Sequence, residues 1–288
     1  MNIKYIFFSC LVLLLSNCGG IDDSPGVHHI IKVSEFNLST SLDQGTNSHA
    51  INEVWVYSTT DVLGVFPLPA TIPYLDEDGS GFIDLTISAG IKANGIAATR
   101  MPYGLYSSLD VEIDFVAGDT TTYVYNSEYV ESANIILCEN FESSNRFQSS
   151  DLSVADIVRT TDDNWVFEGD GSGLILLTDS LFYMTSTTQE QLYDLDEVNG
   201  PIWLEYDYKS DNSFAVGMES LGGMQDQRTP IIIHNSTNGE WKKMYLNLEP
   251  FVASTPGSVG YEITLDATLD SGEESGYVVV DNFKIVHY

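Results

Sequence analysis

The chain has few positive charges. Only 11 of its 288 residues are lysine or arginine, against 42 aspartates and glutamates, so the formal net charge is −31 at pH 7. Such a surface cannot neutralise the phosphates of DNA or RNA, which excludes nucleic acid as a partner. An anionic lipid surface would repel the folded body for the same reason. Acidity of this kind keeps a protein soluble and can also provide sites for divalent cations.

Enzyme signatures are also missing. The sequence has no His-Glu-x-x-His, no Gly-x-Ser-x-Gly and no phosphate-binding Gly-Lys-Ser loop. Its five histidines are scattered, and only His28 and His29 are adjacent. Carboxylates are so abundant that a pair at glycosidase spacing would arise by chance. We therefore expect a protein that is not an enzyme.

A sustained helical period is absent too, so helix should be scarce. Short alternating runs recur instead, separated by Gly, Pro, Asn, Asp and Ser. Residues 109–115 show this most clearly, because their apolar side chains alternate with three acids. The pattern predicts an all-β protein of two β-sandwich domains, over residues 28–136 and 137–288.

The chain begins with the pattern of an export signal. Lys4 is followed by an apolar run from Tyr5 to Leu15. This run is too short to span a bilayer stably, and a single positive charge before it is typical of a signal peptide.

The segment ends with Leu-Ser-Asn-Cys at residues 15–18. This motif resembles the lipobox of bacterial lipoproteins, although the asparagine departs from the usual glycine or alanine. The acids that follow resemble the surface-export signal of Bacteroidota lipoproteins. The resemblance implies a signal peptide at 1–17 and a tether at 18–27, lipidated at Cys18. It also implies a lipid-anchored protein of the outer membrane, exposed on the cell surface.

Cysteine is scarce, with three in the whole chain. Cys10 leaves with the signal and Cys18 is lipidated, so Cys138 remains alone. An intramolecular disulfide is therefore excluded in the mature protein. Cys138 follows an apolar run and is expected to be a small buried side chain.

The first predicted sandwich is immunoglobulin-like or transthyretin-like. Its segments 51–57, 63–69 and 91–99 resemble the N-terminal domains of Bacteroidota surface lipoproteins. That resemblance implies a fold but no particular activity.

The second domain has three short motifs. It opens with Asn-Phe-Glu at 140–142, continues with Gly-Glu-Trp-Lys-Lys at 239–243 and closes with Val-Asp-Asn-Phe-Lys-Ile at 280–285. These resemble the jelly roll of carbohydrate-binding modules and galactose-binding-like domains. The resemblance implies a fold rather than a ligand.

One acidic loop has the spacing of a calcium-binding EF-hand. Asp76, Asp78 and Ser80 stand where the first oxygen ligands would be, and Gly81 stands at the sharp turn. The twelfth position requires a glutamate and is Ile87, and the flanks resemble strands. We expect an acidic hairpin loop that binds calcium weakly or not at all.

A structural calcium is also implied by the resemblance of the second domain. In such jelly rolls the ion often lies where the first and last strands meet, and by position Glu142 and Asp281 would be its ligands. Alternatively, the Asp281-Asn282 pair simply bends the last strand. Both alternatives stay open, and calcium is the cofactor that the sequence suggests.

Sugar binding requires exposed aromatic rings beside polar groups. Trp203, Glu205 and Asp207 alternate with apolar residues and should face away from the core. Trp165, in an acidic loop, is a second candidate, whereas Trp241 is expected in the core. An exposed tryptophan could equally anchor a protein partner.

Two hypotheses about function follow. The first is a binding or accessory subunit that docks against an outer-membrane β-barrel complex in assembly, export or uptake. It is favoured by the membrane anchor, the broad surfaces of two sandwiches and the absence of catalytic motifs. The alternative is a lipoprotein that captures glycans with its jelly roll.

Overall fold

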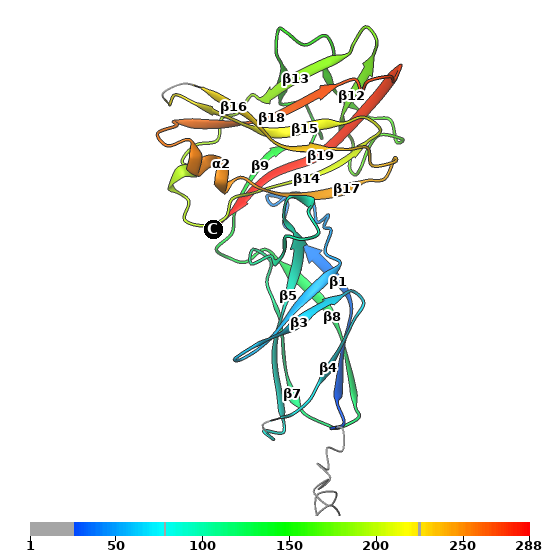
Figure 1. Cartoon of the computed structure of the whole chain (residues 1–288), viewed down its shortest axis with the longest axis vertical. Coiled ribbons are helices and arrows are strands. Elements are labelled where there is room, and N and C mark those ends of the chain that lie inside the picture. The colour runs from blue at the N-terminus through cyan, green and yellow to red at the C-terminus, as the bar shows by residue number, and fades with distance from the viewer. Residues whose placement is uncertain (1–25, 78, 224–225) are drawn as a thin grey trace, which may run out of the picture.

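The computed structural model describes residues 26–77, 79–223 and 226–288, and strands joined by short turns make up most of them (Figure 1). Strands β1 to β8 form a first sandwich, and strands β9 to β19 form a second. The predicted all-β class is confirmed. The predicted signal, Cys18 and Asp78 lie outside the described residues.

The first sandwich consists of two sheets. One has the order β4-β1-β8, and the other has the order β3-β2-β5 with β6 and β7 both paired to β5. β1 and β8 run parallel, although about ninety residues separate them. The strands are β1 (His29–Ser39), β2 (Glu53–Ser58), β3 (Val62–Pro67), β4 (Ala70–Tyr74), β5 (Phe82–Lys92), β6 (Arg100–Pro102), β7 (Leu109–Asp114) and β8 (Thr120–Glu128).

Alternation of side chains explains this core. Along β5, Ile83, Leu85 and Ile87 are at most 1% exposed, while the residues between them face water. On β7, Val111 is buried between two exposed acids, as the sequence pattern predicts. Each sheet of the first sandwich therefore has one buried and one wet face.

The second sandwich also consists of two sheets. One has the order β10-β13-β18-β15-β16, and the other has the order β11-β12-β19-β14-β17, with β9 also paired to β19. The strands are β9 (Asn134–Glu139), β10 (Phe147–Ser149), β11 (Ile157–Thr160), β12 (Ser172–Thr178), β13 (Tyr183–Thr188), β14 (Trp203–Ser210), β15 (Phe214–Leu221), β16 (Gln227–His234), β17 (Lys242–Asn247), β18 (Gly260–Thr268) and β19 (Ser275–His287).

An irregularity in β19 determines which of its side chains reach the core. Val278 and Val280 point inward, and so do Phe283 and Ile285. Regular alternation would place Phe283 on the opposite face from Val280, because the two lie three positions apart. Asn282 between them has φ 57°, a left-handed conformation that asparagine tolerates. The pairing of β14 with β19 shifts at the same place. The Asp281-Asn282 pair thus bends the last strand.

Helix is scarce in the described part of the chain. It comprises α2 (Glu249–Ser254) and two single 3-10 turns, η1 (Ala93–Gly95) and η2 (Leu195–Glu197). None of the helices within the described ranges is long and apolar enough to cross a membrane.

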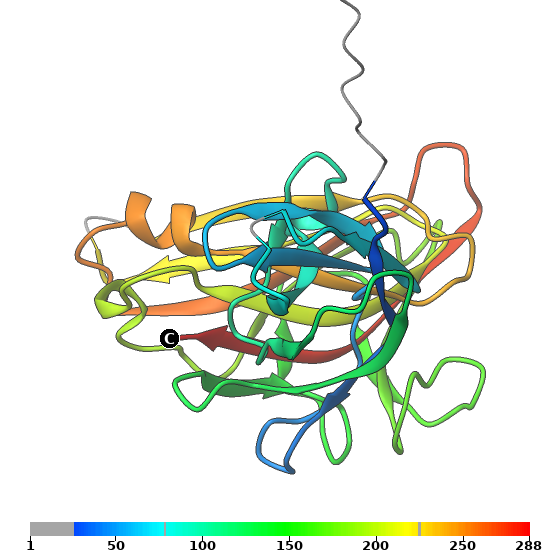
Figure 2. The same cartoon turned by 90° about the horizontal axis from the view of Figure 1, so that it is seen from below.

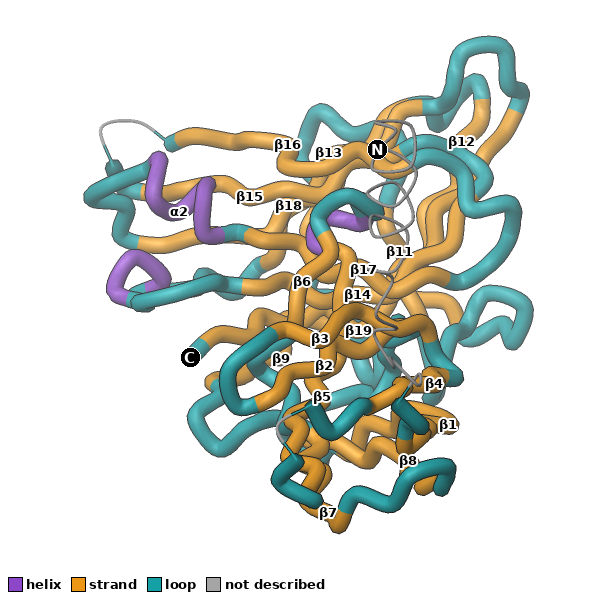
Figure 3. The backbone as a smooth tube through the Cα atoms, turned by 60° about the horizontal axis from the view of Figure 1, so that its bottom comes forward, coloured by secondary structure: helices purple, strands orange, loops and turns teal. Residues whose placement is uncertain are grey.

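The first sandwich packs end-on against the second. Figure 1 shows its upper end below β14, β17 and β19, and Figure 2 shows it in front of that same sheet. The turn η1 lies close to β17 (Figure 3), where Asn94 Oδ1 accepts a hydrogen bond from Asn247 N at 2.8 Å. Trp203, Tyr245 and Val286, all on the second sandwich, belong to the apolar core of the first. The two cores therefore meet at this junction.

Candidate functional site

The residues expected to bind sugar lie at the junction between the sandwiches. Trp203, Glu205 and Asp207 do face away from the core of the second sandwich, as their alternation predicts. They are nevertheless only 2%, 0% and 2% exposed, because the first sandwich covers them. Their expected exposure is corrected by the structure, and this part of the face is closed to a sugar.

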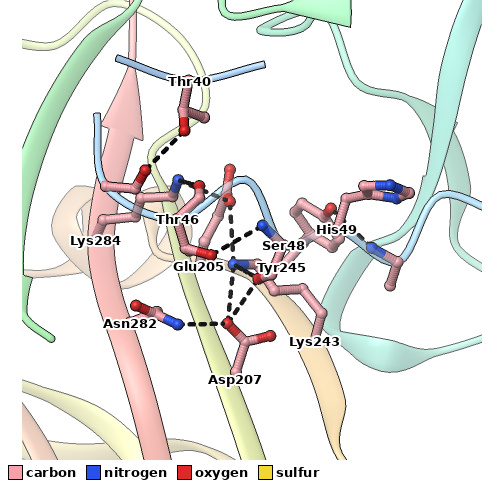
Figure 4. A network of polar contacts seen from close by, with 12 residues as sticks. Thr40, Thr46, Ser48, His49, Glu205, Asp207, Lys243, Tyr245, Asn282 and Lys284 are labelled. Atoms are coloured by element: carbon pink, nitrogen blue, oxygen red, sulfur yellow. Dashed lines mark hydrogen bonds and ion pairs between the residues drawn. The ribbon is translucent and has the colours of Figure 1, made fainter. Parts of the chain in front are cut away.

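Glu205 is the centre of the contacts across the junction. Its Oε1 accepts a hydrogen bond from Tyr103 at 2.6 Å, and both oxygens lie 3.1 Å from the Tyr129 hydroxyl. Its Oε2 lies 3.7 Å from Lys243 Nζ and 3.9 Å from Lys284 Nζ (Figure 4). Two tyrosines of the first sandwich and two lysines of the second thus surround one buried carboxylate.

Asp207 extends these contacts one step along β14. Its Oδ2 accepts a hydrogen bond from Ser48 Oγ of the first sandwich at 2.7 Å and from Asn282 Nδ2 at 3.2 Å. The same oxygen lies 3.5 Å from Lys243 Nζ, which also donates to Ser48 Oγ at 3.0 Å (Figure 4). Lys243 therefore links Asp207 to Glu205.

Lys284 binds the backbone of the first sandwich. Its Nζ donates to the carbonyl oxygens of Gln44 and Thr46 at 3.2 and 3.1 Å. It also lies 4.8 Å from the centre of the Tyr129 ring. Burial lowers the pKa of Lys284 to about 8, although Glu205 acts in the opposite direction.

We call Glu205, Asp207, Lys243 and Lys284 the junction network. Its two acids and two lysines balance in charge, and each has partners in or facing the first sandwich. Buried ions are costly unless they are paired and hydrogen-bonded, and such networks specify one arrangement rather than adding stability. The junction network is therefore a structural contact that fixes how the sandwiches meet.

A second group of aromatic side chains lies farther along the same outer face and remains partly exposed. Lys209 Nζ lies 5.3 Å from the Trp165 ring centre and 5.1 Å from that of Trp241. Tyr277 meets Trp165 edge-on at 4.7 Å, and Phe167 contacts Trp241 at 4.9 Å. We call these five residues the aromatic patch.

The loop that carries Trp165 is fixed in place. Asp162 accepts hydrogen bonds on its side chain from Asn164 N and Nδ2, and on its carbonyl from Trp165 N. Lys209 Nζ, whose pKa is lowered by burial, donates to the Asn164 carbonyl at 2.8 Å. The ring of Trp165 is therefore held by a turn and by a lysine beneath it.

Trp241 does not belong to the core, and that prediction is wrong. It lies just before β17 and is partly exposed on the outer face. Met244 and Leu246 point into the core, so the alternation places Trp241 and Lys243 on the other side. The alternating pattern of this strand was the signal that would have predicted the outward position of Trp241.

The acidic loop at residues 75–81 joins two strands, as predicted, but it is not a hairpin. It leads from β4 in one sheet to β5 in the other. Asp76 Oδ1 accepts a hydrogen bond from Ser80 N at 3.0 Å and from Ser80 Oγ at 3.2 Å, and its Oδ2 accepts one from Gly81 N at 2.9 Å. Both oxygens of Asp76 thus hold the turn, while Asp78 lies outside the described residues.

Glu142 and Asp281 have separate surroundings. Glu142 Oε2 accepts a hydrogen bond from Asp170 N at 2.9 Å, and Asp281 Oδ2 accepts one from Ser172 Oγ at 2.7 Å. Burial, together with Asp207 and Glu168, raises the pKa of Asp281 to about 8. Within the described ranges, no group of three or more His, Cys, Asp or Glu is arranged to hold a metal ion.

Cys138 is buried and free, as predicted. Burial raises the pKa of its thiol to about 12, so the thiolate is absent at neutral pH. This cysteine is a packing residue of the second core.

No protein-family model matches the chain, and no curated protein matches it either. Solved structures similar to this chain include carbohydrate-binding modules. One is a family 30 module of a cellulosomal cellulase of Clostridium thermocellum, at 14% identity and a TM-score of 0.39, covering 53% of this chain and 96% of that one. Another is TmCBM61 in complex with β-1,4-galactotriose, at 13% identity and a TM-score of 0.36, covering 52% and 95%. A third, from a study of promiscuous modules of the β-sandwich superfamily, has 14% identity and a TM-score of 0.35, covering 80% and 83%. Similarities at this level assign no function to the chain.

Proposed function

We propose that this protein is a non-catalytic glycan-binding protein and that the aromatic patch is its binding surface. The observation that supports this is the set of partly exposed rings of Trp165, Trp241 and Tyr277, held around the buried Lys209. Rings fixed before binding lose little conformational freedom when a sugar packs on them.

Polar groups suited to sugar hydroxyls border these rings. Asp163 lies in the turn that carries Trp165, Glu240 precedes Trp241, and Asp211 Oδ1 accepts a hydrogen bond from Tyr277 N at 2.6 Å. All three acids are exposed. Carboxylates accept hydrogen bonds from hydroxyl groups, so apolar rings and polar acceptors stand together, as ligand sites require.

The test is binding to a glycan array and to soluble plant and microbial polysaccharides in affinity electrophoresis. We expect binding by the wild type and a loss of roughly 30-fold, or about 2 kcal/mol, in Trp165→Ala, because a stacking ring is removed. Trp241→Ala should have a similar effect.

Tyr193→Ala is the matched control. Tyr193 is 58% exposed on the same sandwich but lies outside the aromatic patch. Its replacement should leave glycan affinity unchanged. Equal binding by wild type and Trp165→Ala, or no glycan bound by any of the proteins, would refute the proposed site.

We also infer that the protein is held at the outer membrane, facing outward, by acyl chains on Cys18. Figure 1 shows the chain entering the first sandwich at the end opposite the second, so an anchor there would hold the second sandwich farthest from the membrane. Mass spectrometry of the native protein should find Cys18 as the acylated first residue. Detection of an unmodified Cys18 in the mature protein would contradict this localisation.

Docking against an outer-membrane β-barrel complex is the second candidate function. It is favoured by a groove of apolar and acidic side chains at the end of the first sandwich where the chain enters. An anchored protein would present this end to a partner in the membrane. Glycan binding by the second sandwich and docking by the first would use separate surfaces.

A further inference from the structure

A groove lies in the first sandwich and shares no residue with the aromatic patch. Its volume is about 740 Å³. It opens between β3, an edge strand of one sheet, and β4, an edge strand of the other. Its apolar surface is formed by six side chains, Leu63, Phe66, Pro73, Tyr74, Leu75 and Phe82.

The rim of this groove is acidic. Asp61, Glu77 and Asp84 line it and are exposed, while none of the lysines and arginines in the described part of the chain lines it. None of these three acids forms an ion pair with any residue in the described ranges. Asp84 accepts a long hydrogen bond from Thr59 Oγ1, at 3.3 Å, and Asp61 accepts one from Thr60 Oγ1 at 2.8 Å. The rim therefore attracts cations.

The edge strand β3 adds a surface for backbone pairing. It pairs with β2 on one side and has no strand neighbour on the other among the described residues. Val62, Leu63 and Val65 are 58%, 41% and 37% exposed along it. Proteins usually protect such edges, because an exposed apolar edge strand is a template for another extended chain.

From these three features we infer that the groove binds an extended basic segment of a partner protein. Apolar side chains of the segment would enter the groove, and its lysines or arginines would face Asp61, Glu77 and Asp84. Charge complementarity favours this occupant. Anionic lipid headgroups and acidic polysaccharides would be repelled by the rim, and a neutral glycan would leave its charges unused.

This inference deepens the docking candidate, since it states the chemistry of the partner, and it is independent of glycan binding. The test measures fluorescence anisotropy of a labelled peptide of alternating valine and lysine, titrated with the mature chain. The same peptide with glutamate in place of lysine is the probe control. We expect the lysine peptide to bind at least roughly tenfold more tightly, with affinity falling as salt is added.

Two variants locate the binding. The double variant Asp61→Asn, Asp84→Asn should weaken the lysine peptide by roughly tenfold, and Leu63→Ser should weaken it through the apolar part. Glu112→Gln, an exposed acid of β7 outside the groove, is the matched control and should change nothing. Trp165→Ala should also have no effect, so failure of glycan binding and failure of this inference are distinguishable.

Three outcomes would overturn the inference. They are equal binding of the lysine and glutamate peptides, no binding of either, and equal affinity of the wild type and the groove variants. Binding of a neutral glycan that is lost in Leu63→Ser but not in Trp165→Ala would assign the groove to a sugar instead.

Discussion

Glu205 is a fully buried carboxylate on the outer face of a sheet, and it shows how single residues join the two sandwiches. Its partners are Tyr103 and Tyr129 from the first sandwich and Lys243 and Lys284 from the second. The alternation along β14 predicted that Glu205 points away from the core of the second sandwich, but an acid pointing outward from a strand usually faces water. Only a partner surface from another part of the chain buries it, and short-range patterns carry no information about that surface.

His234 is a second buried polar residue, and its burial makes the stability of the fold depend on pH. It lies among Tyr206, Tyr208 and Phe214, and its Nε2 shares a hydrogen bond of 2.6 Å with the Tyr206 hydroxyl. Burial, helped by Lys242, lowers its pKa from 6.5 to about 3. The folded protein therefore keeps this imidazole neutral where the unfolded chain would protonate it.

This gives a prediction about acid stability. Below pH about 6.5 the unfolded state binds a proton that the folded state refuses until about pH 3, so the free energy of unfolding falls as pH falls through this window. The slope from this residue is at most about 1.4 kcal/mol per pH unit. In His234→Gln that contribution should disappear.

Urea unfolding of wild type and His234→Gln at several pH values measures the difference. The variant should be less stable at neutral pH, and the gap should narrow steadily as the solution is acidified. A gap that stays constant between neutral pH and pH about 4 would show that His234 titrates normally in the folded protein.

At the scale of strands, the sequence predicted the features that depend on neighbouring residues, such as the direction of side chains along a strand. The alternation in β7 and β14 gave the direction of their side chains. Pro67 ends β3 and Pro73 lies in β4, both strands at sheet edges, and Pro69 lies between the two strands. The parallel pairing of β1 with β8 was beyond prediction, because its partners are distant in the chain. The loop at 75–81 was taken for a hairpin because local sequence does not show that a strand changes sheet.

The candidate site shows the same division. Trp165 was predicted because an acidic turn around a tryptophan is a local feature. The role of Lys209 was not predicted, since the lysine and the two rings that it contacts come from three separate segments. Trp203 was placed on the correct face but assigned to the wrong surroundings, because the first sandwich covers it.

At the scale of the whole molecule, the junction joins two cores into one unit. Trp203, Tyr245 and Val286 are covalently part of the second sandwich but pack in the core of the first. Contacts between domains in one chain are usually small and polar, and the domains then move relative to each other. Here apolar side chains and the balanced junction network lie in the same contact, so we expect the orientation of the sandwiches to be fixed.

The fixed orientation leads to a prediction about unfolding. Because neither sandwich can lose its structure without exposing residues of the other core, the mature protein should unfold in one calorimetric transition.

Glu205→Gln removes the charge that balances Lys243 and Lys284, and removal of one partner from a buried ion network costs about 3 kcal/mol. That loss falls on the junction, so the single transition of the wild type should separate into two in Glu205→Gln. The exposed Glu112→Gln should keep one transition within about 0.5 kcal/mol of the wild type. Two transitions already present in the wild type would mean that the sandwiches are independent, and the buried charges would then need an explanation other than fixing their orientation.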